Sequence, residues 1–396
     1  MMLGHTPING RMIDNTDDST IIVVGAGIAG CHAARELASE YTVTVVERSN
    51  VAAEATGLSA GLIAPALFYG DIPDVATHIT KFVREFDGTH GFEFTERDRL
   101  DFIKSNDVSE ARNQSDQLAN DGFPVSYLDA AAVADRYPQF DQEQFAGAVF
   151  YRDTGWVDPY TYANALRADA EERGATVETS VTVTELLTED GSVTGVQTTD
   201  GRYDADAVVV AAGWRTQELL PDSVTLQARP YRTQCIVLSP DEPLSAEFPL
   251  GRLGDEHLYF RPEHNGDLLI GGAHETISDP TSADTDADES FTLEVANFIP
   301  EFIQGFKTAE FVNGWSGVDV ATPDTRPIID APANGPDGLI VATGFNGLGV
   351  TLSPVVGPVV RHRLTGESIE FSAAVFDADR FSSTTSDFEY VSTSEL

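Results

Sequence analysis

The clearest pattern of apolar and polar positions in the chain begins at Ile21. From there the run IIVVGAGIAGCHAARELASEYTVTVVER contains an apolar segment, a glycine-rich turn, an amphipathic segment and a second apolar segment. Short continuous apolar runs are typical of buried parallel strands, and apolar positions at helical spacing indicate a helix that covers a sheet. The pattern therefore predicts a complete βαβ unit whose second strand ends at Glu47.

Residues 76–140 interrupt this pattern with a mixed and aromatic stretch. They predict a helix followed by a strand, with further helices near 110–120 and 130–137. We interpret this stretch as an insertion into the α/β pattern.

The α/β pattern resumes at residues 158–213, which predict a helix, a strand, a hairpin around 190–191 and a strand that ends at Gly213. Segments of residues 216–322, such as RTQCIVLS, HLYFRPE and GDLLIGGAHE, alternate as the strands of an antiparallel sheet do. The later run GLIVATGFNGLGVTLSPVVGPVVRHRLTG then predicts a buried strand, a glycine turn and a closing helix.

The glycine turn of the βαβ unit carries the first candidate chemistry. Gly25, Gly27 and Gly30 form a GxGxxG motif between strand and helix, where missing side chains permit a tight turn, close approach of a pyrophosphate and close helix packing. Backbone N–H groups at the helix start can bind the phosphates. Glu47 closes the second strand, where a carboxylate can accept hydrogen bonds from ribose hydroxyls. Together these features predict dinucleotide binding.

The predicted dinucleotide could be FAD or NAD, and several separated glycine-rich segments favour FAD. The loop EATGLSAGLIAP is small and flexible, as a loop must be where a bulky cofactor lies against backbone. The segments VVVAAGW and GLIVATGFNGLGVTLSP each end a buried strand with glycine, as if several pieces converge on one extended ligand. An NAD-dependent enzyme remains an alternative on these residues alone.

The order of these pieces resembles the superfamily of FAD-dependent oxidoreductases that includes D-amino-acid oxidase, glycine oxidase and sarcosine oxidase. The resemblance spans about residues 20–365. It rests on IIVVGAGIAG, DTGWVDPYTYANAL, VVVAAGW, HLYFRPEHNGDLLIGG, GWSGVDVATPDTRPIID and GFNGLGVTLSP. The TPD and YFRPE portions look most like sarcosine oxidase β-subunits and related dehydrogenases.

This resemblance implies FAD binding by the glycine turn, the end of the second strand and three later loops. Reduced flavin carries negative charge at N1 and O2, and the helix that begins near Gly349 would direct its positive end there. The cofactor-binding residues that the resemblance implies are Gly25, Ala26, Gly27, Ile28, Ala29, Gly30, Glu47, Arg48, Thr56, Ser59, Ala60, Gly61, Val183, Gly213, Trp214, Gly344, Phe345, Asn346, Gly347, Leu348, Gly349, Val350 and Thr351.

The chain departs from its family at positions that matter for substrate and flavin. Asp319 stands where glycine oxidases place an arginine for the substrate carboxylate, and Thr351 stands where monomeric sarcosine oxidases use a lysine. The positions of the family's covalent flavin links align with Gly317 and Leu58, so FAD is expected to be noncovalent. Tyr259 matches the substrate tyrosine of glycine oxidases.

A substrate carboxylate still needs a cation in a low-dielectric site. The candidates are Arg261 in YFRPE and Arg232 in RPYRTQ, with a structural salt bridge as the alternative for each. His257 and His274 are candidate bases or amine-binding groups, with a structural role as their alternative. The candidate catalytic residues are accordingly Tyr259, Arg261 and His274.

Three further residues near the predicted flavin have structural interpretations. Trp214 and Trp315 could face the flavin or substrate, but large aromatic side chains more often belong to the core. Asp324 in the TPD motif is expected to bind backbone N–H groups rather than to act as a catalytic acid.

The predicted fold class is α/β, or α+β overall, with a Rossmann-like FAD-binding domain and an interleaved, mainly antiparallel-sheet substrate domain. At 396 residues, two globular regions are expected. The acidic stretch 278–290 is expected to be a solvated loop. The expected domains are a flexible tail at 1–19, an FAD-binding domain at 20–75, 141–215 and 323–365, a substrate-binding domain at 76–140 and 216–322, and a C-terminal tail at 366–396.

The amino-acid composition predicts the salt conditions in which the protein works and excludes some classes of binding partner. The 64 acidic and 24 basic residues give a formal charge of −40, which molar salt would screen to a distance of about 3 Å, so a halophilic setting is expected. Nucleic acid and anionic membranes require basic patches and are excluded as partners. The two cysteines have no metal-ligand spacing, so no metal site is expected. The absence of a long apolar run or signal peptide predicts no membrane span and a cytoplasmic location.

The resemblance implies oxidation of a C–N bond in a small amine or amino acid, such as sarcosine, glycine, proline or a D-amino acid, by hydride transfer to flavin N5. The electrons would pass to O2, a quinone or an electron-acceptor protein, and a hetero-oligomeric partner is possible. One alternative is a dye- or quinone-linked dehydrogenase subunit. Another is a noncatalytic flavin-binding subunit, which the loss of both carboxylate-binding cations favours.

Overall fold

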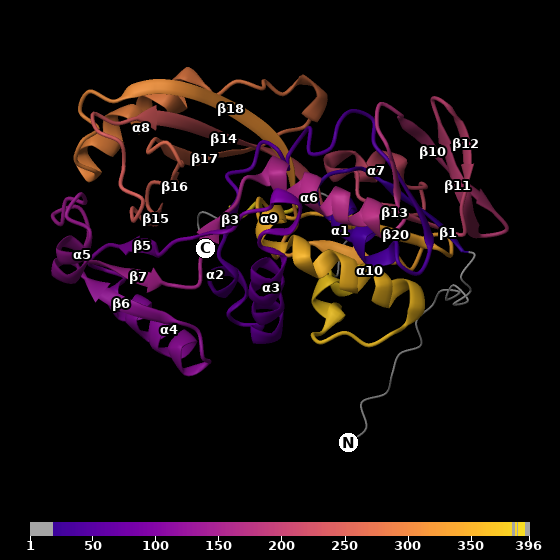
Figure 1. Cartoon of the computed structure of the whole chain (residues 1–396), viewed down its shortest axis with the longest axis horizontal. Helices are drawn as coiled ribbons and strands as arrows, with labels where there is room; N and C mark the ends of the chain where they lie inside the picture. The colour runs from indigo at the N-terminus through magenta and orange to yellow at the C-terminus, as the bar shows by residue number, and fades with distance from the viewer. Residues whose placement is uncertain (1–18, 382–384, 386, 393–396) are drawn as a thin grey trace.

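The computed structural model describes residues 19–381, 385 and 387–392, arranged around two sheets of different character (Figure 1). The expected flexible tail at 1–19 lies outside the described residues except for Ser19. The first sheet has six strands, which are in spatial order β19 (Ile328–Asp330), β20 (Leu339–Thr343), β13 (Ala207–Val210), β1 (Thr20–Val24), β2 (Thr42–Val46) and β9 (Thr176–Glu178). All neighbouring strands in it are parallel except β19 and β20.

Both faces of the parallel sheet are covered, which explains why its strands are apolar throughout. Helix α1 (Ile28–Leu37) contacts both α6 (Pro159–Glu172) and α10 (Val356–Thr365) on one face, where Ile21 and Val23 join their core. The alternate residues of β1 join a core on the other face, beneath a small sheet. That small sheet consists of β10 (Val183–Glu189), β11 (Ser192–Thr198) and β12 (Gly201–Asp204).

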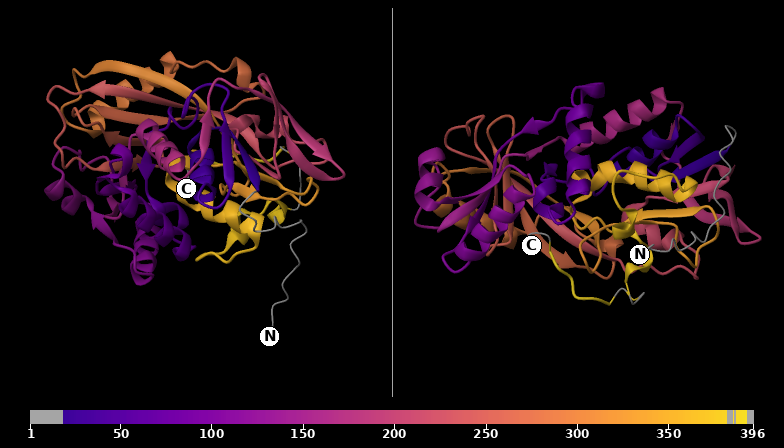
Figure 2. Two further views of the ribbon diagram at one scale, coloured as in Figure 1. Left: turned by 45° about the vertical axis from the view of Figure 1, so that its right-hand side comes forward. Right: turned by 90° about the horizontal axis from the view of Figure 1, so that it is seen from below.

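The second sheet is large, and its neighbouring strands are antiparallel except for one pair. In that pair, β15 (Leu250–Leu253) and β5 (Arg99–Ile103) are parallel. Figure 2 shows this sheet at the opposite end of the molecule from α10. Its eight strands are in spatial order β18 (Glu310–Ala321), β14 (Arg229–Ser239), β17 (Leu268–Thr276), β16 (Leu258–Pro262), β15 (Leu250–Leu253), β5 (Arg99–Ile103), β7 (Gly147–Tyr151) and β6 (Val125–Asp129).

The two faces of the large sheet have different roles because successive residues of a strand point to opposite sides. In β14, Ile236 and Leu238 join a core that also contains Phe291 and Phe302 of α8 (Glu289–Phe302). Cys235 and Val237, which alternate with them, belong to a separate cluster on the other face. One face is therefore core, and the other is free to form the wall of a cleft.

Figure 1 labels the helices that have not yet been described. The helices are α2 (Pro65–Tyr69), α3 (Pro73–Phe86), α4 (Val108–Asn120), α5 (Ala130–Arg136), α7 (Thr216–Leu219) and α9 (Gly349–Leu352), with 3-10 turns η1 (Thr89–Gly91), η2 (Gly213–Arg215), η3 (Pro280–Ser282), η4 (Ser353–Val355), η5 (Ala373–Phe376) and η6 (Ala378–Arg380). A third small sheet has the order β3 (Leu62–Ile63), β8 (Gly155–Trp156) and β4 (Thr95–Glu96). Within the described residues, no helix has the length and apolar character needed to cross a membrane.

This architecture confirms the predicted fold class, and it differs from the sequence analysis in detail. Strand β7 pairs with β5 and β6 in the large sheet, although residues 141–215 were expected in the FAD-binding domain. The acidic stretch 278–290 is not simply solvated, because it contains η3, the start of α8 and acceptors for a buried arginine. Both differences come from long-range contacts that local periodicity does not encode.

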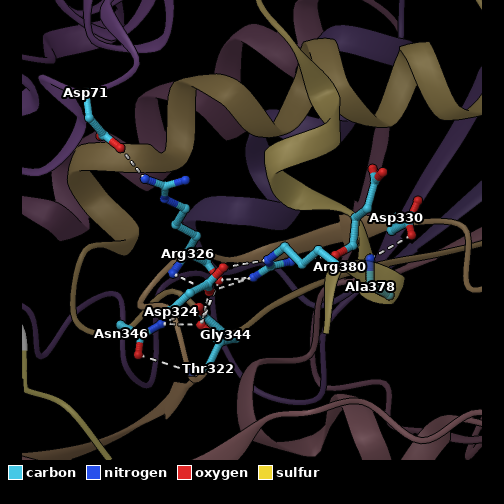
Figure 3. Close-up of polar contacts among 10 residues, drawn as sticks. Asp71, Thr322, Asp324, Arg326, Asp330, Gly344, Asn346, Ala378 and Arg380 are labelled. Atoms are coloured by element: carbon cyan, nitrogen blue, oxygen red, sulfur yellow. Dashed lines mark hydrogen bonds and ion pairs between the residues drawn. The ribbon is translucent and has the colours of Figure 1, made fainter. Parts of the chain in front are cut away.

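The C-terminal segment is anchored to the body of the protein rather than leaving it (Figure 3). Asp324 accepts hydrogen bonds from Arg380 Nε (2.8 Å) and from the backbone N of Arg326 (3.1 Å), which agrees with the structural role expected for the TPD motif. Nearby, Ala378 N donates to Asp330 Oδ2 (2.8 Å). The expected C-terminal tail is therefore an ordered segment over its described residues, while 382–384, 386 and 393–396 lie outside them.

Candidate functional site: a cleft between the two sheets

One extended cleft lies between the carboxyl ends of the parallel strands and the free face of the large sheet. Turns that follow β1, β2, β13 and β20 form one wall, and strands β5, β14, β15, β16, β17 and β18 contribute to the other. Ligands of open parallel sheets bind at the carboxyl ends of their strands, where helix N-termini and loops converge. The cleft therefore occupies the position that this topology favours for a cofactor.

The glycine turn after β1 forms one end of the cleft. Gly25 has a φ of 103°, and a Cβ there would lie 2.5 Å from the carbonyl oxygen of Ala211 on the neighbouring strand. Only glycine fits this combination of left-handed backbone and close approach. Gly27 begins α1 without a side-chain cap, so the start of this helix presents backbone to the cleft.

Glu47 lies directly beyond β2 and holds this turn in place. Its Oε2 accepts a hydrogen bond from Ala26 N (2.9 Å), and its Oε1 accepts one from Ser49 N (2.7 Å). The side chain also lines the cleft, where remaining lone pairs can accept from a ligand. Glu47 thus organises the turn, a role that the sequence analysis did not anticipate beside the predicted ribose contact.

The loop after β2 joins the glycine turn to a pair of arginines. Thr56 Oγ1 accepts a hydrogen bond from Ile28 N (3.0 Å), which fixes the loop against the start of α1. Arg215 binds both oxygens of Glu54 (2.9 and 2.7 Å), and Arg48 forms an ion pair with the same carboxylate. Two guanidinium groups share one carboxylate, so this stretch of the cleft presents N–H donors of a kind that binds phosphates.

The turn after β20 forms the other end of the cofactor wall. Asn346 has a φ of 52°, and its side-chain amide makes two hydrogen bonds with Thr322 (Figure 3). Its Nδ2 donates to Thr322 Oγ1 (3.0 Å), and its Oδ1 accepts from the backbone N of Thr322 (3.1 Å). Thr351 Oγ1 donates to the carbonyl of Leu62 (2.7 Å). Helix α9 begins at Gly349, as the sequence predicts for the closing helix, and it starts at the cleft.

These features fit an elongated FAD molecule. A side-chain-free turn, a pair of arginines and a helix N-terminus follow one another along one wall, matching a dinucleotide pyrophosphate and an electron-rich ring. Gly317 and Leu58 stand at the positions of the family's covalent flavin links. They lie close together, because a Cβ added to Gly317 would be 3.2 Å from Leu58 Cδ1. Neither residue carries a group that can bond to flavin.

The structure brings most of the predicted site residues together in this cleft. The exceptions are Ala26, Gly30, Gly61, Trp214, Asn346 and Arg261, which do not line it. The predicted residues that line it are Gly25, Gly27, Ile28, Ala29, Glu47, Arg48, Thr56, Ser59, Ala60, Val183, Gly213, Gly344, Phe345, Gly347, Leu348, Gly349, Val350, Thr351, Tyr259 and His274.

The geometry does not support Arg261 or Arg232 as the substrate cation. Arg261 Nε donates to the carbonyl of Ala60 (2.5 Å), and its Nη1 lies 3.1 Å from Glu263 Oε2. Arg232 is buried and binds both oxygens of Asp288 (2.9 and 3.0 Å). Both arginines are already neutralised by carboxylates, so we assign them structural roles.

The large sheet forms the wall of the cleft that faces the cofactor turns, and we call it the substrate wall. His274 lies in this wall as a neutral side chain. A β-bulge in β17, with Ala273 at a φ of 50°, accompanies its position on the cleft side. Burial, assisted by the charge of His257, lowers the pKa of His274 to about 4. Its Nδ1 lies 2.6 Å from Ser392 Oγ, so the C-terminal segment supports this wall. His257 itself does not line the cleft.

Asp319 and Tyr231 occupy the end of the substrate wall next to the β20 turn. Asp319 Oδ2 accepts a hydrogen bond from Gly347 N (2.6 Å), and Tyr231 OH donates to the same oxygen (3.5 Å). Burial raises the pKa of Asp319. Asp319 therefore stands at the position of an arginine in glycine oxidases, and it connects the large sheet to the turn after β20.

The sequence analysis missed Arg99, Asp101 and Arg252, which also belong to this cleft region. Arg99 and Arg252 line the cleft, and Asp101 lies between them. Alternate charged residues in the strand RLDFI were a usable signal, because apolar strands rarely bury two charges on one face without a reason. The pairing of this strand with LGRL was not apparent from the sequence.

Acidification is expected to destabilise the fold through two histidines, His32, which is buried, and His274, which is partly buried. Burial also lowers the pKa of His32 well below its usual value. An unfolded histidine titrates near 6.5, so between that pH and about 4 the unfolded state binds more protons. Stability is retained above this window and falls as pH drops through it, by roughly 3 kcal/mol for His274.

Urea unfolding midpoints measured across this window test the prediction. His274→Gln should flatten the pH dependence, whereas His264→Gln at an exposed position should change it less. An identical slope in the His274 variant and the parent protein would contradict the prediction.

The fold and cleft together define a dinucleotide-binding protein with a large antiparallel sheet opposite the binding turns. Residues 20–363 match the family model described as FAD dependent oxidoreductase, DAO. The chain therefore belongs to this family of FAD-dependent oxidoreductases, which confirms the resemblance found in the sequence and makes it an FAD-dependent enzyme.

Individual relatives support the same placement. The chain is 25% identical to a glycine oxidase of Geobacillus kaustophilus, over 91% of this chain and 96% of that protein. It is 29% identical to a D-amino acid dehydrogenase of Allorhizobium ampelinum, over 67% of this chain and 62% of that protein.

Solved structures show the same fold. The crystal structure of the Geobacillus kaustophilus glycine oxidase matches with a TM-score of 0.78 and 22% identity, over 92% of this chain and all of that chain. An L-proline dehydrogenase from P. horikoshii matches with a TM-score of 0.81 and 21% identity, over 92% of this chain and 98% of that chain.

Proposed function

We propose that the protein oxidises a C–N bond of a small amino acid. The observation that carries this proposal is the position of the cleft, which places the polar face of the large sheet opposite the turns that fit FAD. The names of two relatives, glycine oxidase and D-amino acid dehydrogenase, support amino acids as the substrate class. FAD held by the turns after β1, β13 and β20 would supply the two-electron chemistry.

The residues of the chain bind, orient and shield the substrate in this proposal. Tyr259 and Tyr231 line the cleft as neutral phenols, because burial raises the pKa of each well above its usual value. Their hydroxyl groups can exchange hydrogen bonds with a polar substrate. Trp315 donates Nε1 to the carbonyl of Leu58 (2.8 Å), which closes the substrate wall against the loop after β2. The imine product then hydrolyses in water.

The position of His274 supports a role near the amine. At neutral pH it is uncharged, so it does not repel an ammonium group, and it carries no positive charge to attract a carboxylate. Its hydrogen bond to Ser392 holds the ring orientation. We assign it as a substrate-positioning residue.

Anaerobic reduction of the bound flavin tests the proposal. The protein is purified in molar salt, and its visible spectrum is recorded before and after addition of glycine, sarcosine, proline and a panel of D-amino acids. We expect the absorption of oxidised flavin to bleach with at least one amino acid. Dithionite serves as the control, because it should bleach the flavin whether or not a substrate is present.

The outcomes separate the alternatives. Bleaching by dithionite but by no amine or amino acid would contradict the proposal and favour a noncatalytic flavin-binding subunit. When a substrate is found, readmitted oxygen or an added quinone-like dye distinguishes an oxidase from a dehydrogenase by which of them restores the oxidised spectrum.

A further inference from the structure

We propose that Asp319 binds the protonated amino group of the substrate, at the end of the substrate wall next to the turn after β20. This inference rests on the proposed amino-acid chemistry and adds where the amino group lies. It also assigns a specificity, because the cleft then accepts a cation at the position where glycine oxidases place an arginine for the substrate carboxylate.

The sheet register places Asp319 on the cleft side of the substrate wall. Asp319 of β18 pairs directly with Tyr231 of β14. The neighbouring pair on the same face joins Gly317 to Thr233. Directly paired residues of adjacent strands project to the same face, and all four of these residues line the cleft. The carboxylate of Asp319 therefore belongs to the surface that faces the cofactor turns.

Hydrogen bonds hold this carboxylate beside the turn that follows β20. Asp319 Oδ2 accepts one from Gly347 N (2.6 Å) and one from Tyr231 OH (3.5 Å). Gly347 lies in the turn that leads into α9, and it lines the cleft as well. A carboxylate has about four lone-pair sites, so acceptor capacity remains for a donor from a ligand.

The charge of Asp319 has no cationic partner among the residues that the structure describes. Burial raises the pKa of its carboxyl group, and the groups that act in the opposite direction are neutral donors, the N–H groups of Val320 and Gly347 and the Tyr231 hydroxyl. Removing a carboxylate from water without a cation beside it is costly. An ammonium group would offset that cost through a charge-assisted hydrogen bond, so this position favours a cationic ligand.

The side chains next to Asp319 are compatible with a cation. Burial keeps Tyr231 a neutral phenol by raising its pKa, and the ring of Tyr231 meets the ring of His274 edge to face, with 5.8 Å between their centroids. The faces of aromatic rings attract cations. With a pKa of about 4, His274 is uncharged at neutral pH and does not repel an ammonium group.

Binding of an amine that cannot be oxidised tests this inference. tert-Butylammonium carries the positive charge but has no hydrogen on its α-carbon, and tert-butanol is a neutral molecule of the same shape. Their binding to the FAD-loaded protein is measured by ligand-observed NMR through the methyl signal, at constant salt. We expect the parent protein to bind tert-butylammonium about 30-fold more tightly than tert-butanol, and Asp319→Asn to abolish this preference.

Asp204→Asn is the matched control, because it removes the same charge from the surface of a strongly acidic protein. The side chain of Asp204 is 78% exposed, and its loss should leave the preference for the cation unchanged. This control separates binding at Asp319 from general attraction of cations to the negative surface.

A merely structural role of Asp319 would give a different result. Asp319→Asn keeps an oxygen that can accept from Gly347 N, so FAD content and melting temperature should stay near those of the parent. A structural role would instead weaken both ligands alike or lower the FAD content. Should Asp319→Asn not fold, Asp319→Ser provides the same comparison, because serine also offers an acceptor without a charge.

A second readout uses substrates. With an amino acid that reduces the flavin of the parent protein, Asp319→Asn should raise KM by about 30-fold and lower kcat much less, because the lost interaction is one of binding. Asp319→Glu, which retains the charge, should restore part of the affinity.

The outcomes are distinct from those of the proposed function. Equal binding of tert-butylammonium and tert-butanol by the parent would overturn the inference, as would an unchanged preference in a folded Asp319→Asn protein. Failure of every amino acid to reduce the flavin would instead count against the proposed reaction, while a loss of the preference in Asp319→Asn would still support the cation site.

Discussion

Gly30→Ala is expected to weaken FAD binding by about 100-fold or more, because the new side chain would separate α1 from the glycine turn. A Cβ at this position would lie 1.9 Å from the carbonyl oxygen of Gly25 and 3.0 Å from its carbonyl carbon. Both contacts are with backbone, so no rotamer change relieves them. Titration of the apoprotein with FAD, followed by flavin fluorescence, measures the loss.

Gly254→Ala is the matched control for this substitution. The nearest atom to a Cβ there is Arg252 Nη2 at 3.8 Å, an ordinary contact, and Gly254 lies outside the cofactor loops. FAD affinity should remain that of the parent protein. Full FAD occupancy in a folded Gly30→Ala variant would show that the close approach in this turn is not required for the cofactor.

Arg232→Met is expected to lower the free energy of unfolding by about 3 kcal/mol without changing KM. The guanidinium group binds Asp288, the carbonyl of Asp286 (2.7 Å) and Ser316 Oγ (3.0 Å), so its loss releases the segment before α8. We place the effect at the lower end for a buried ion pair because the side chain of Asp288 is 44% exposed. Urea unfolding followed by circular dichroism in high salt gives the measurement.

Arg202→Met provides the comparison for a surface arginine. Its ion pair with Asp204 joins side chains that are 55% and 78% exposed, so the change should stay within about 0.5 kcal/mol. An Arg232 variant with unchanged stability and a raised KM would return Arg232 to the substrate site and remove the structural role assigned to it.

The cofactor wall was largely predictable because its signals are local. The strand, glycine turn and helix around Gly25 follow from periodicity and from the need for a turn without side chains, and the helix predicted near 130–137 corresponds to α5. The second strand ends at Val46, one residue before the predicted Glu47. Neighbouring residues in the chain determine these features, so the sequence alone contains them.

The substrate wall was not predictable in the same way, because its chemistry depends on which strands pair. No motif marks Arg252, and only the tertiary structure shows that it shares Asp101 with Arg99. The parallel pairing of β15 with β5 joins segments about 150 residues apart, a distance that no local pattern encodes.

By itself, then, the sequence determined the family, the FAD-binding turns and the loss of the usual substrate cations, since each is a property of consecutive residues. Only the tertiary structure decided which charged side chains pair with one another. The physical reason is that the effective charge of a buried arginine depends on its neighbours in space, and strand order and register select those neighbours.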